Sequence, residues 1–242
     1  MFMDYFTVKN AWKVIVLSKD MRQTFTNRGL SDKNIHVVNN FIFQTLANPK
    51  TDKITRRESK KIRFIFAGSL GRFQNLKTLI KGISLFRDRD DLEFLFLGDG
   101  PLKSEIEAYS TAEELRNVFF ISQVPVEKAL EYMSSCDVGI VSISKGVSKV
   151  AFPSKSIMYM SVGLPVLAIL DRNSELSNLL ESNNFGIAVE PNSSEIEKGV
   201  NLILEQLEMN KFSRSLIRTY AEENYSKTVI TEKLTNLMLG YK

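Results

Sequence analysis

The sequence predicts an α/β fold built on a doubly wound parallel sheet, and three observations support this prediction. From Ile62 onward, short apolar runs alternate with amphipathic stretches. Each amphipathic stretch is long enough to form the crossover helix that parallel strands require. Hydrophobic residues make up 43% of the 242 residues and charged residues 25%, which is the composition of an ordinary globular chain.

Six apolar runs are predicted as the strands of this sheet: 62–67, 92–97, 118–121, 138–141, 166–170 and 186–189. Helical patterns lie between them, at 77–86, 102–109, 126–134, 154–162 and 175–181. After Pro191 the chain is predicted to be helical to its end, in three segments that break near Lys211 and Asn224. Ser226 is the predicted N-cap of the last segment, because its hydroxyl can accept from a first-turn amide.

The first part of the chain predicts a smaller unit. Two strand-like runs, 14–17 and 35–38, flank a helix at 19–28 that ends at Gly29. Two strands and one helix bury too little surface to fold alone. We therefore divide the chain into a small unit at 1–48, a polar linker at 49–60 and a main domain at 61–242.

The small unit is expected to expose apolar side chains and strand edges. The expected exposed set is Trp12, Val14, Val16, Ile35 and Val37. Such a surface needs cover from a second copy or a partner chain. Dimers or a strand-exchanged assembly are therefore expected in solution.

Composition excludes several classes of protein. Cys136 is the only cysteine and His36 the only histidine, so a disulfide scaffold, a structural zinc site and a Cys/His nucleophilic pair are excluded. This cysteine usage favours a reducing, cytosolic setting. No apolar run approaches the ~20 residues of a membrane span, and the start lacks the pattern of a signal peptide. The net charge of +4 suits phosphate ligands, but no basic and aromatic pattern indicates nucleic-acid binding.

The loop after the first strand of the main domain is a candidate anion site. It reads Gly68-Ser69-Leu70-Gly71-Arg72 and leads into a helix, where free amides and the helix dipole favour a phosphate. The alternative is a tight turn that needs glycine for a positive φ. The spacing is neither that of a dinucleotide fold nor that of a P-loop. Gly98-Asp99-Gly100-Pro101, after the second strand, is interpreted as a structural turn, because Asp99 would repel a phosphate.

A second candidate anion site opens the helix at 154–162. Ser154 offers a hydroxyl and Lys155 an ammonium, and a doubly wound sheet brings them to the same edge as the first loop. Two converging sites are more specific than either alone. The alternatives are an ordinary N-cap for Ser154 and a solvated first-turn charge for Lys155.

These residues match a known family. The string F-P-S-K-S-I-M-Y-M-S-V-G-L-P-V-L-A at 152–168 resembles the P-S-K-x-x-E-Y-M-x-x-G-x-P-V-x-A block of retaining glycosyltransferases of the group 1 (family 4) type, which have the GT-B architecture. Supporting similarities lie at 66–71, 97–101, 117–123 and 136–138, in order over 61–242. The stretches 14–19 and 36–40 look like the last strand–helix–strand of the family's first lobe.

The resemblance implies a Rossmann-like second lobe that binds a nucleotide-diphosphate sugar, a UDP- or GDP-sugar, and a first lobe or partner chain that binds the acceptor. It implies no metal and no cofactor at this site, so charge and amides stabilise the leaving diphosphate. By position, Arg72 and Lys155 are the catalytic cations. The remaining implied contacts are Gly68, Ser69, Gly71, Gln74 and Ser154 at the diphosphate, and Gln123 and Val124 beside the base.

The chain departs from the family pattern at four positions. The two glutamates of the family's E-x(7)-E motif, the second of which holds the donor ribose, fall at Val150 and Met158. The usual arginine and lysine of the first loop fall at Ser69 and Gln74, which leaves Arg72 as the main cation there. The alternative for Met158 is a plain core methionine.

The resemblance therefore implies a glycosyltransferase lobe of bacterial polysaccharide synthesis, cytoplasmic or at the inner face of the membrane with at most peripheral contact. The alternative is a non-catalytic nucleotide-sugar-binding module, or a donor subunit that needs a separate acceptor-lobe chain. A nucleotide-sugar epimerase of the same architecture is disfavoured, because His36 is the only histidine. We expect that the isolated chain does not transfer sugar efficiently, because positioning of the acceptor contributes much of the catalysis.

Overall fold

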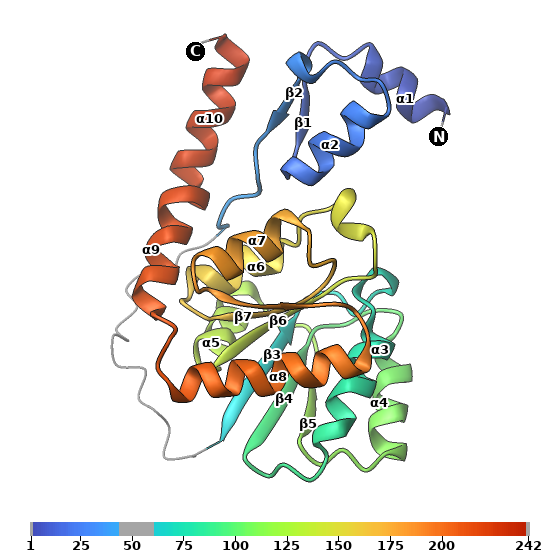
Figure 1. Ribbon diagram of the computed structural model, residues 1–242, viewed down its shortest axis with the longest axis vertical. Helices are drawn as coiled ribbons and strands as arrows, with labels where there is room; N and C mark the ends of the chain where they lie inside the picture. Colours follow the sequence, from blue (N-terminus) through green and yellow to red (C-terminus); the bar gives the residue numbers. More distant parts are fainter. Residues whose placement is uncertain (1, 44–60, 241–242) are drawn as a thin grey trace.

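The computed structural model describes residues 2–43 and 61–240 (Figure 1). Residues 61–240, the main lobe, contain a six-stranded, fully parallel sheet in the order β5-β4-β3-β6-β7-β8. Its strands are β3 (Ile62–Ala67), β4 (Leu92–Leu97), β5 (Val118–Ile121), β6 (Val138–Ser142), β7 (Val166–Ile169) and β8 (Gly186–Val189). The predicted doubly wound α/β sheet is confirmed.

Helices cover both faces of this sheet. They are α3 (Leu76–Ile83), α4 (Lys103–Ala112), α5 (Val126–Ser134), α6 (Ser154–Ser161), α7 (Glu175–Ser182), α8 (Ser193–Glu208) and α9 (Arg214–Tyr225). Alternate residues of β3 point to opposite faces, so Phe64 joins the core under α3, α4 and α8, and Ile65 joins the core under α5, α6, α7 and α9. Short 3₁₀ turns add η2 (Arg72–Gln74), η3 (Ser84–Phe86) and η4 (Val147–Lys149).

The strand order sets a topological switch point between β3 and β6. The chain winds from β3 outward through β4 to β5, and from β6 outward through β7 to β8. The loops after β3 and β6 therefore leave the sheet toward opposite faces. Ligands of open α/β sheets bind at such a point, outside the carboxyl ends of the strands.

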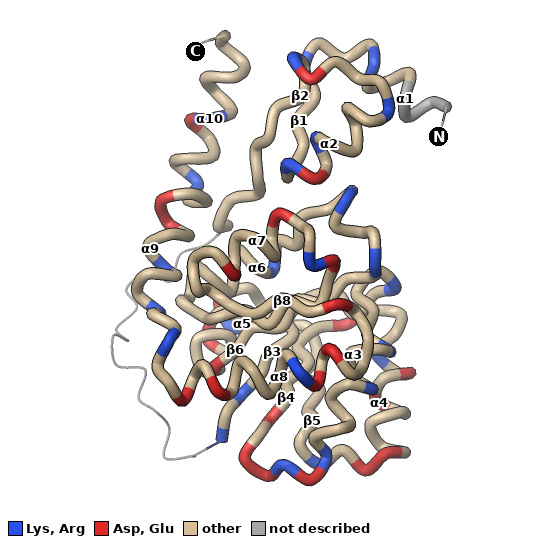
Figure 2. The backbone as a smooth tube through the Cα atoms, in the orientation of Figure 1, with Lys and Arg blue, Asp and Glu red and all other residues tan. Residues whose placement is uncertain are grey.

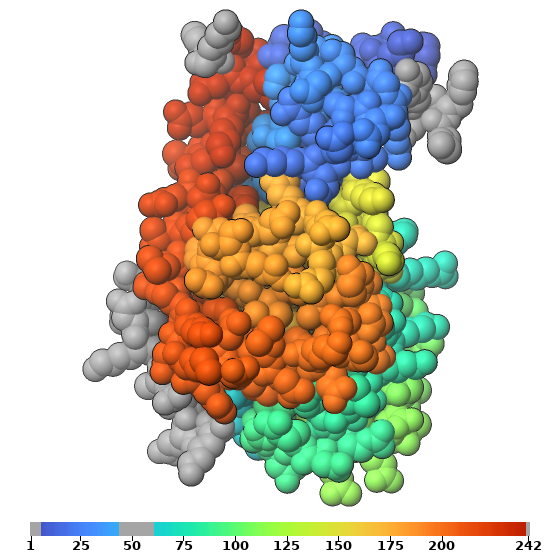
Figure 3. All heavy atoms as spheres, in the orientation of Figure 1, coloured from blue at the N-terminus to red at the C-terminus, as the bar shows by residue number. Residues whose placement is uncertain are grey.

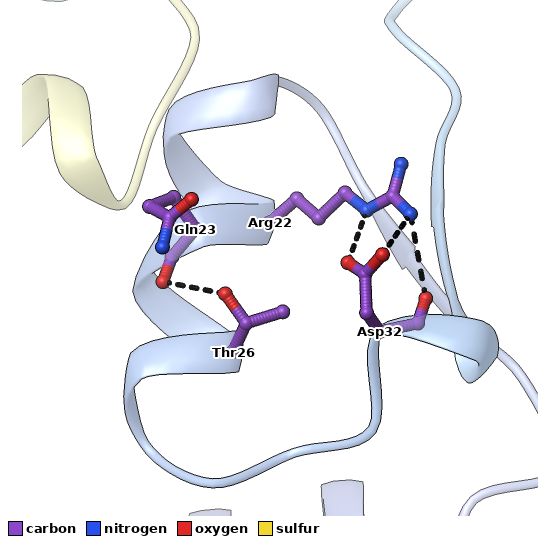
Figure 4. A network of polar contacts seen from close by, with 4 residues as sticks. All are labelled: Arg22, Gln23, Thr26 and Asp32. Atoms are coloured by element: carbon purple, nitrogen blue, oxygen red, sulfur yellow. Dashed lines mark hydrogen bonds and ion pairs between the residues drawn. The ribbon is translucent and has the colours of Figure 1, made fainter.

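Residues 2–43, the N-terminal unit, form a second, smaller parallel sheet. Its elements are α1 (Phe2–Lys9), β1 (Val14–Val16), α2 (Lys19–Asn27), η1 (Asp32–Asn34) and β2 (Ile35–Val37). Ser18 caps α2 by accepting from the Met21 amide at 3.1 Å. Two nitrogens of Arg22 donate to the Asp32 carboxylate, each at 2.6 Å, and this ion pair ties α2 to η1 (Figure 4). Within α2, the Thr26 hydroxyl donates to the Gln23 carbonyl.

The expected exposure of the N-terminal unit is largely wrong. Trp12 is 66% exposed as expected, but Val16 is 1% and Ile35 2% exposed. Val14 and Val37 are half-buried. The reason is that α2 packs on β1 and β2 and covers one face of the pair. Ile15, which alternates with Val14 and Val16 along β1, is exposed instead.

The C-terminal helices connect the two parts of the molecule. Ser226 caps α10 (Lys227–Leu239) by accepting from the Val229 amide at 3.4 Å, which confirms the predicted cap. Helix α10 runs beside the N-terminal unit (Figure 1), and Lys13 Nζ donates to the Leu237 carbonyl. The Ile42 amide donates to the Tyr225 carbonyl at 2.8 Å. The predicted linker at 49–60 lies outside the described residues.

Candidate functional site

Two backbone hydrogen bonds fix the loop after β3 against the end of β4 and the turn that follows it. The Gly68 amide donates to the Leu97 carbonyl at 2.8 Å, and the Leu70 amide to the Asp99 carbonyl at 2.9 Å. Leu70 is buried in the core, while Gly68 and Ser69 are exposed. The loop therefore presents its backbone at the switch point, with its only large apolar side chain turned inward.

The Gly98–Gly100 turn has the structural role that the sequence predicts. A Cβ on Gly98 would lie 2.1 Å from the Gly68 carbonyl oxygen, and one on Gly100 would lie 2.6 Å from that of Leu70. Lys103 Nζ lies 2.6 Å from Asp99 Oδ1, and this contact lowers the pKa of Asp99 below its usual range. The Gln123 amide also donates to Asp99, at 2.7 Å. The turn is thus packed backbone against backbone with the first loop.

Pro153, not Ser154, is the N-cap of α6, so the N-cap alternative for Ser154 is wrong. The proline φ of −68° suits this place, and Pro153 makes no side-chain cap. Ser154 is exposed at the first helical position. The Ser156 amide donates to the Pro153 carbonyl at 3.1 Å, so the Ser154 and Lys155 amides are the donors that this end of α6 offers to a ligand.

Lys155 brings the two predicted segments together. Its Nζ lies 3.1 Å from where a Gly68 Cβ would be and 4.2 Å from the Phe66 ring centroid. Within residues 2–43 and 61–240 no carboxylate forms an ion pair with it. Burial lowers the pKa of Lys155 to about 8. The alternative of a solvated charge is therefore wrong: Lys155 is half-buried, with its ammonium beside the first loop and over the Phe66 ring.

Gln74 supplies an unused polar atom at the same place. Its Oε1 lies 2.9 Å from where a Gly71 Cβ would be, and this buried oxygen has no hydrogen-bond partner in the described part of the chain. The next residue, Asn75, takes a left-handed φ of 48° and so begins α3 sharply. Arg72 is exposed in η2.

The remaining predicted residues lie around this centre. Met158 is half-buried against the core and follows Lys155 by three residues, which is the same face of α6. Val150 is exposed. Gln123 is exposed after β5, and Val124 packs partly against the core.

Contacts between the N-terminal unit and the main lobe were not predicted from the sequence. The Thr24 hydroxyl donates to the Lys149 carbonyl at 2.8 Å, and the Glu175 amide donates to Asp20 Oδ2 at 2.7 Å. The Lys19 amide donates in return to Glu175 Oε2. Figure 3 shows the unit seated on α7 and the segment that contains η4. These pairs are more than a hundred residues apart, and no local pattern marks them.

The charges and the helices of the described residues set limits on the site. Within residues 2–43 and 61–240, no group of three His, Cys, Asp or Glu side chains could hold a metal ion. Figure 2 shows basic and acidic positions interspersed along the chain, including α9 and α10. None of the helices in these two ranges has the length and apolar content to cross a membrane.

Comparisons with known proteins agree with this fold. The sequence model described as "Glycosyl transferases group 1" matches residues 48–220. The chain is 23% identical over 235 residues to the "Probable glycosyltransferase WbjE" of Pseudomonas aeruginosa, covering 94% of this chain and 58% of that one. The chain thus spans less than two thirds of this curated relative.

Two solved structures illustrate the shared fold. Anabaena Alr3699/HepE in complex with UDP and glucose has a TM-score of 0.80 at 16% identity, over 99% of this chain and 66% of that chain. A variant of S. aureus TarM in a complex that includes UDP has a TM-score of 0.73 at 21% identity, over 98% of this chain and 46% of that chain. The main lobe is therefore the Rossmann-like lobe of a GT-B fold.

Proposed function

The chain belongs to the group 1 glycosyltransferases, and from this premise we propose that it binds a nucleotide-diphosphate sugar and serves its transfer to an acceptor. The observation that supports this most is the approach of Lys155 to Gly68 at the switch point. The UDP in the HepE structure, a protein of the same fold, favours a UDP-sugar over a GDP-sugar.

In the proposed reaction, the diphosphate lies between the loop after β3 and the start of α6. The bond between the anomeric carbon and the diphosphate oxygen breaks, the acceptor oxygen forms the new glycosidic bond, and the proton of the acceptor hydroxyl passes to the leaving diphosphate. We propose that the anomeric configuration is retained. The Ser69 and Gly71 amides of the first loop, the α6 dipole and the Lys155 ammonium stabilise the charge that develops on the leaving diphosphate. Arg72, exposed on η2, supplies a second cation.

Calorimetry with UDP and UMP tests the diphosphate assignment. We expect UDP to bind more tightly, because each charged hydrogen bond to the second phosphate adds ~1.5–3 kcal/mol. Equal affinities for UDP and UMP would refute the diphosphate assignment.

Arg72→Ala and Lys155→Ala should each weaken UDP binding about tenfold, a loss of ~1.4 kcal/mol, with little change in Tm. Lys198→Ala on α8, whose lysine pairs with Glu195 at the surface, is the matched control and should bind normally.

Met158 tests whether the ribose lies where the family places it. Met158→Glu should tighten UDP binding, because a carboxylate accepts hydrogen bonds that a thioether accepts poorly. Met158 is half-buried, so the new carboxylate keeps access to water. A fall in Tm without tighter binding would instead indicate a core position.

The second candidate, a nucleotide-sugar-binding module without catalysis, is favoured by the four departures from the family pattern. The two functions differ in turnover. A transferase should consume UDP-sugar when an acceptor lobe is supplied, whereas a module binds UDP and leaves the donor intact. We propose that the chain alone hydrolyses donor slowly at most and self-associates through its N-terminal unit, which light scattering on the same sample checks.

A further inference from the structure

We propose that Asp171 is a positioning residue for the donor site, and this proposal rests on the proposed function. Asp171 holds residues 143–151, here named the bridge loop, which link β6 to the start of α6. Asp171 itself follows β7, so it belongs to neither segment that forms the anion site.

Asp171 fixes the middle of the bridge loop. Its Oδ1 and Oδ2 accept from the Gly146 amide at 3.1 and 2.9 Å, and Oδ2 also accepts from the Ser148 hydroxyl. Gly146 takes a left-handed φ of 79°, and Ser148 is buried. One half-buried carboxylate thus satisfies two donors of a turn that itself contains neither a strand nor an α-helix.

The bridge loop contacts the η2 turn of the site and also the N-terminal unit. The Ser144 amide donates to the Phe73 carbonyl at 2.8 Å, which ties it to the turn that carries Arg72 and Gln74. The Lys149 carbonyl accepts from the Thr24 hydroxyl of the N-terminal unit. Downstream, Phe152 and Pro153 connect the loop to α6 and Lys155. A displacement of this loop would therefore move the η2 turn, the start of α6 and the contact with α2 together.

The charge of Asp171 matters as well as its shape. A carboxylate accepts from both donors, and hydrogen bonds to an ionised acceptor are about twice as strong as neutral ones. Alanine leaves the Gly146 amide and the buried Ser148 hydroxyl without this acceptor. Asparagine retains one oxygen, so Asp171→Asn should keep part of the effect.

Two readouts test the proposal on the full chain. The first is hydrogen exchange at the Ser144 amide, which should be about tenfold faster in Asp171→Ala and less accelerated in Asp171→Asn. The second is the affinity for UDP, measured well below Tm, which should fall tenfold or more in Asp171→Ala and less in Asp171→Asn. Ser148→Ala removes one donor only and covers the case in which Asp171→Ala does not fold; it should show smaller changes in both readouts.

Asp137→Ala is the matched control. Asp137 is also half-buried and accepts a backbone amide, that of Arg63 at 2.9 Å, but it lies at the opposite end of the strands. This variant should lower Tm and leave UDP affinity and Ser144 exchange unchanged. The proposal is overturned if the Asp171 variants leave Ser144 exchange unchanged, if they bind UDP like the native chain, or if Asp137→Ala weakens UDP binding equally. If the native chain binds no UDP, the proposed function fails, and the exchange measurement alone decides whether Asp171 holds the loop.

Discussion

The main lobe and the N-terminal unit are built from the same parallel strand–helix–strand element, yet they differ in how that element is covered. In the main lobe, helices cover both faces of the sheet, and Phe64, Phe66, Phe94 and Phe96 are all at most 1% exposed. In the unit, one helix covers two strands, and Ile15 and Trp12 remain exposed. Parallel sheets are stable when both faces are covered, so the unit depends on its neighbours.

The contacts between these regions are mixed in character. Leu17 and Ile42 pack into the core of the main lobe, whereas α2 and α7 meet through polar atoms at their N-termini. Asp20 and Glu175 each accept an amide from the other helix, so each carboxylate lies at the positive end of the opposing helix dipole. Burial raises the pKa of Glu175 above its usual range. The comparison predicts large effects of substitutions in the main lobe and small ones in the unit.

The largest effect is expected for Phe94→Ala in the centre of the sheet. Phe94 stacks on Phe64 at 5.0 Å between centroids and lies 6.3 Å from Phe86. The cavity left by the ring should lower the free energy of unfolding by ~3–5 kcal/mol in urea titrations. A loss below about 1 kcal/mol would contradict the prediction that the core of the main lobe dominates stability.

Tyr159→Phe should cost less, about 1–3 kcal/mol, because it removes one buried acceptor. The Ala67 amide donates to Tyr159 Oη at 2.7 Å, immediately before Gly68. Tyr109→Phe is the control, since the Tyr109 hydroxyl has no hydrogen bond within the described residues. In thermal unfolding, Tyr159→Phe should have a lower Tm than Tyr109→Phe, and equal Tm values would contradict the prediction.

A titration of UDP affinity against pH tests the role of Lys155 in the main lobe. Burial lowers the pKa of Lys155 to about 8. A bound diphosphate favours the ammonium form, so UDP affinity should fall as pH rises through 8. Lys155→Arg keeps its charge and should lose this dependence. A UDP affinity that is flat from pH 7 to 9.5 in the native chain would contradict this prediction.

The same pKa shift affects stability without ligand. The unfolded chain binds the Lys155 ammonium proton more tightly than the folded chain does, so the contribution of Lys155 to stability rises between pH 8 and 10.5.

The smallest effect is expected for Trp12→Ser in the N-terminal unit. An exposed side chain contributes little to folding, so the free energy of unfolding should change by no more than about 0.5 kcal/mol. Self-association measured by light scattering should decrease, because an exposed aromatic side chain is removed. A large loss of stability would mean that the unit has a core of its own.

Much of the main lobe was predictable because most of its strands are buried on both faces and appear as continuous apolar runs. The bounds at 62–67, 92–97, 118–121 and 186–189 match the structure. Helix α1 was not predicted, since F-M-D-Y-F-T-V-K lacks a clear helical period. In the unit, alternation along β1 was predictable, but the packing of α2 that buries Val16 was not.

The candidate site shows the same division. The doubly wound topology brings the loop after β3 and the start of α6 to one edge, so their proximity could be predicted from order alone. The burial of Lys155 over Phe66 and the unpaired oxygen of Gln74 depend on side-chain packing. The contacts of Thr24 and Asp171 join segments distant in sequence and leave no periodic signal. Whether the predicted residues bind donor stays a prediction.

The position of α10 beside the N-terminal unit has a mechanical consequence. The described chain starts and stops at the same end of the molecule, and Lys13 and Leu237 are in contact there (Figure 1). A pulling force applied between residues 2 and 240 would load this contact and the Ile42–Tyr225 hydrogen bond before it reaches the sheet. The unit and α10 should therefore detach first, as a low-force event in an optical trap, followed by rupture of the six-stranded sheet at higher force.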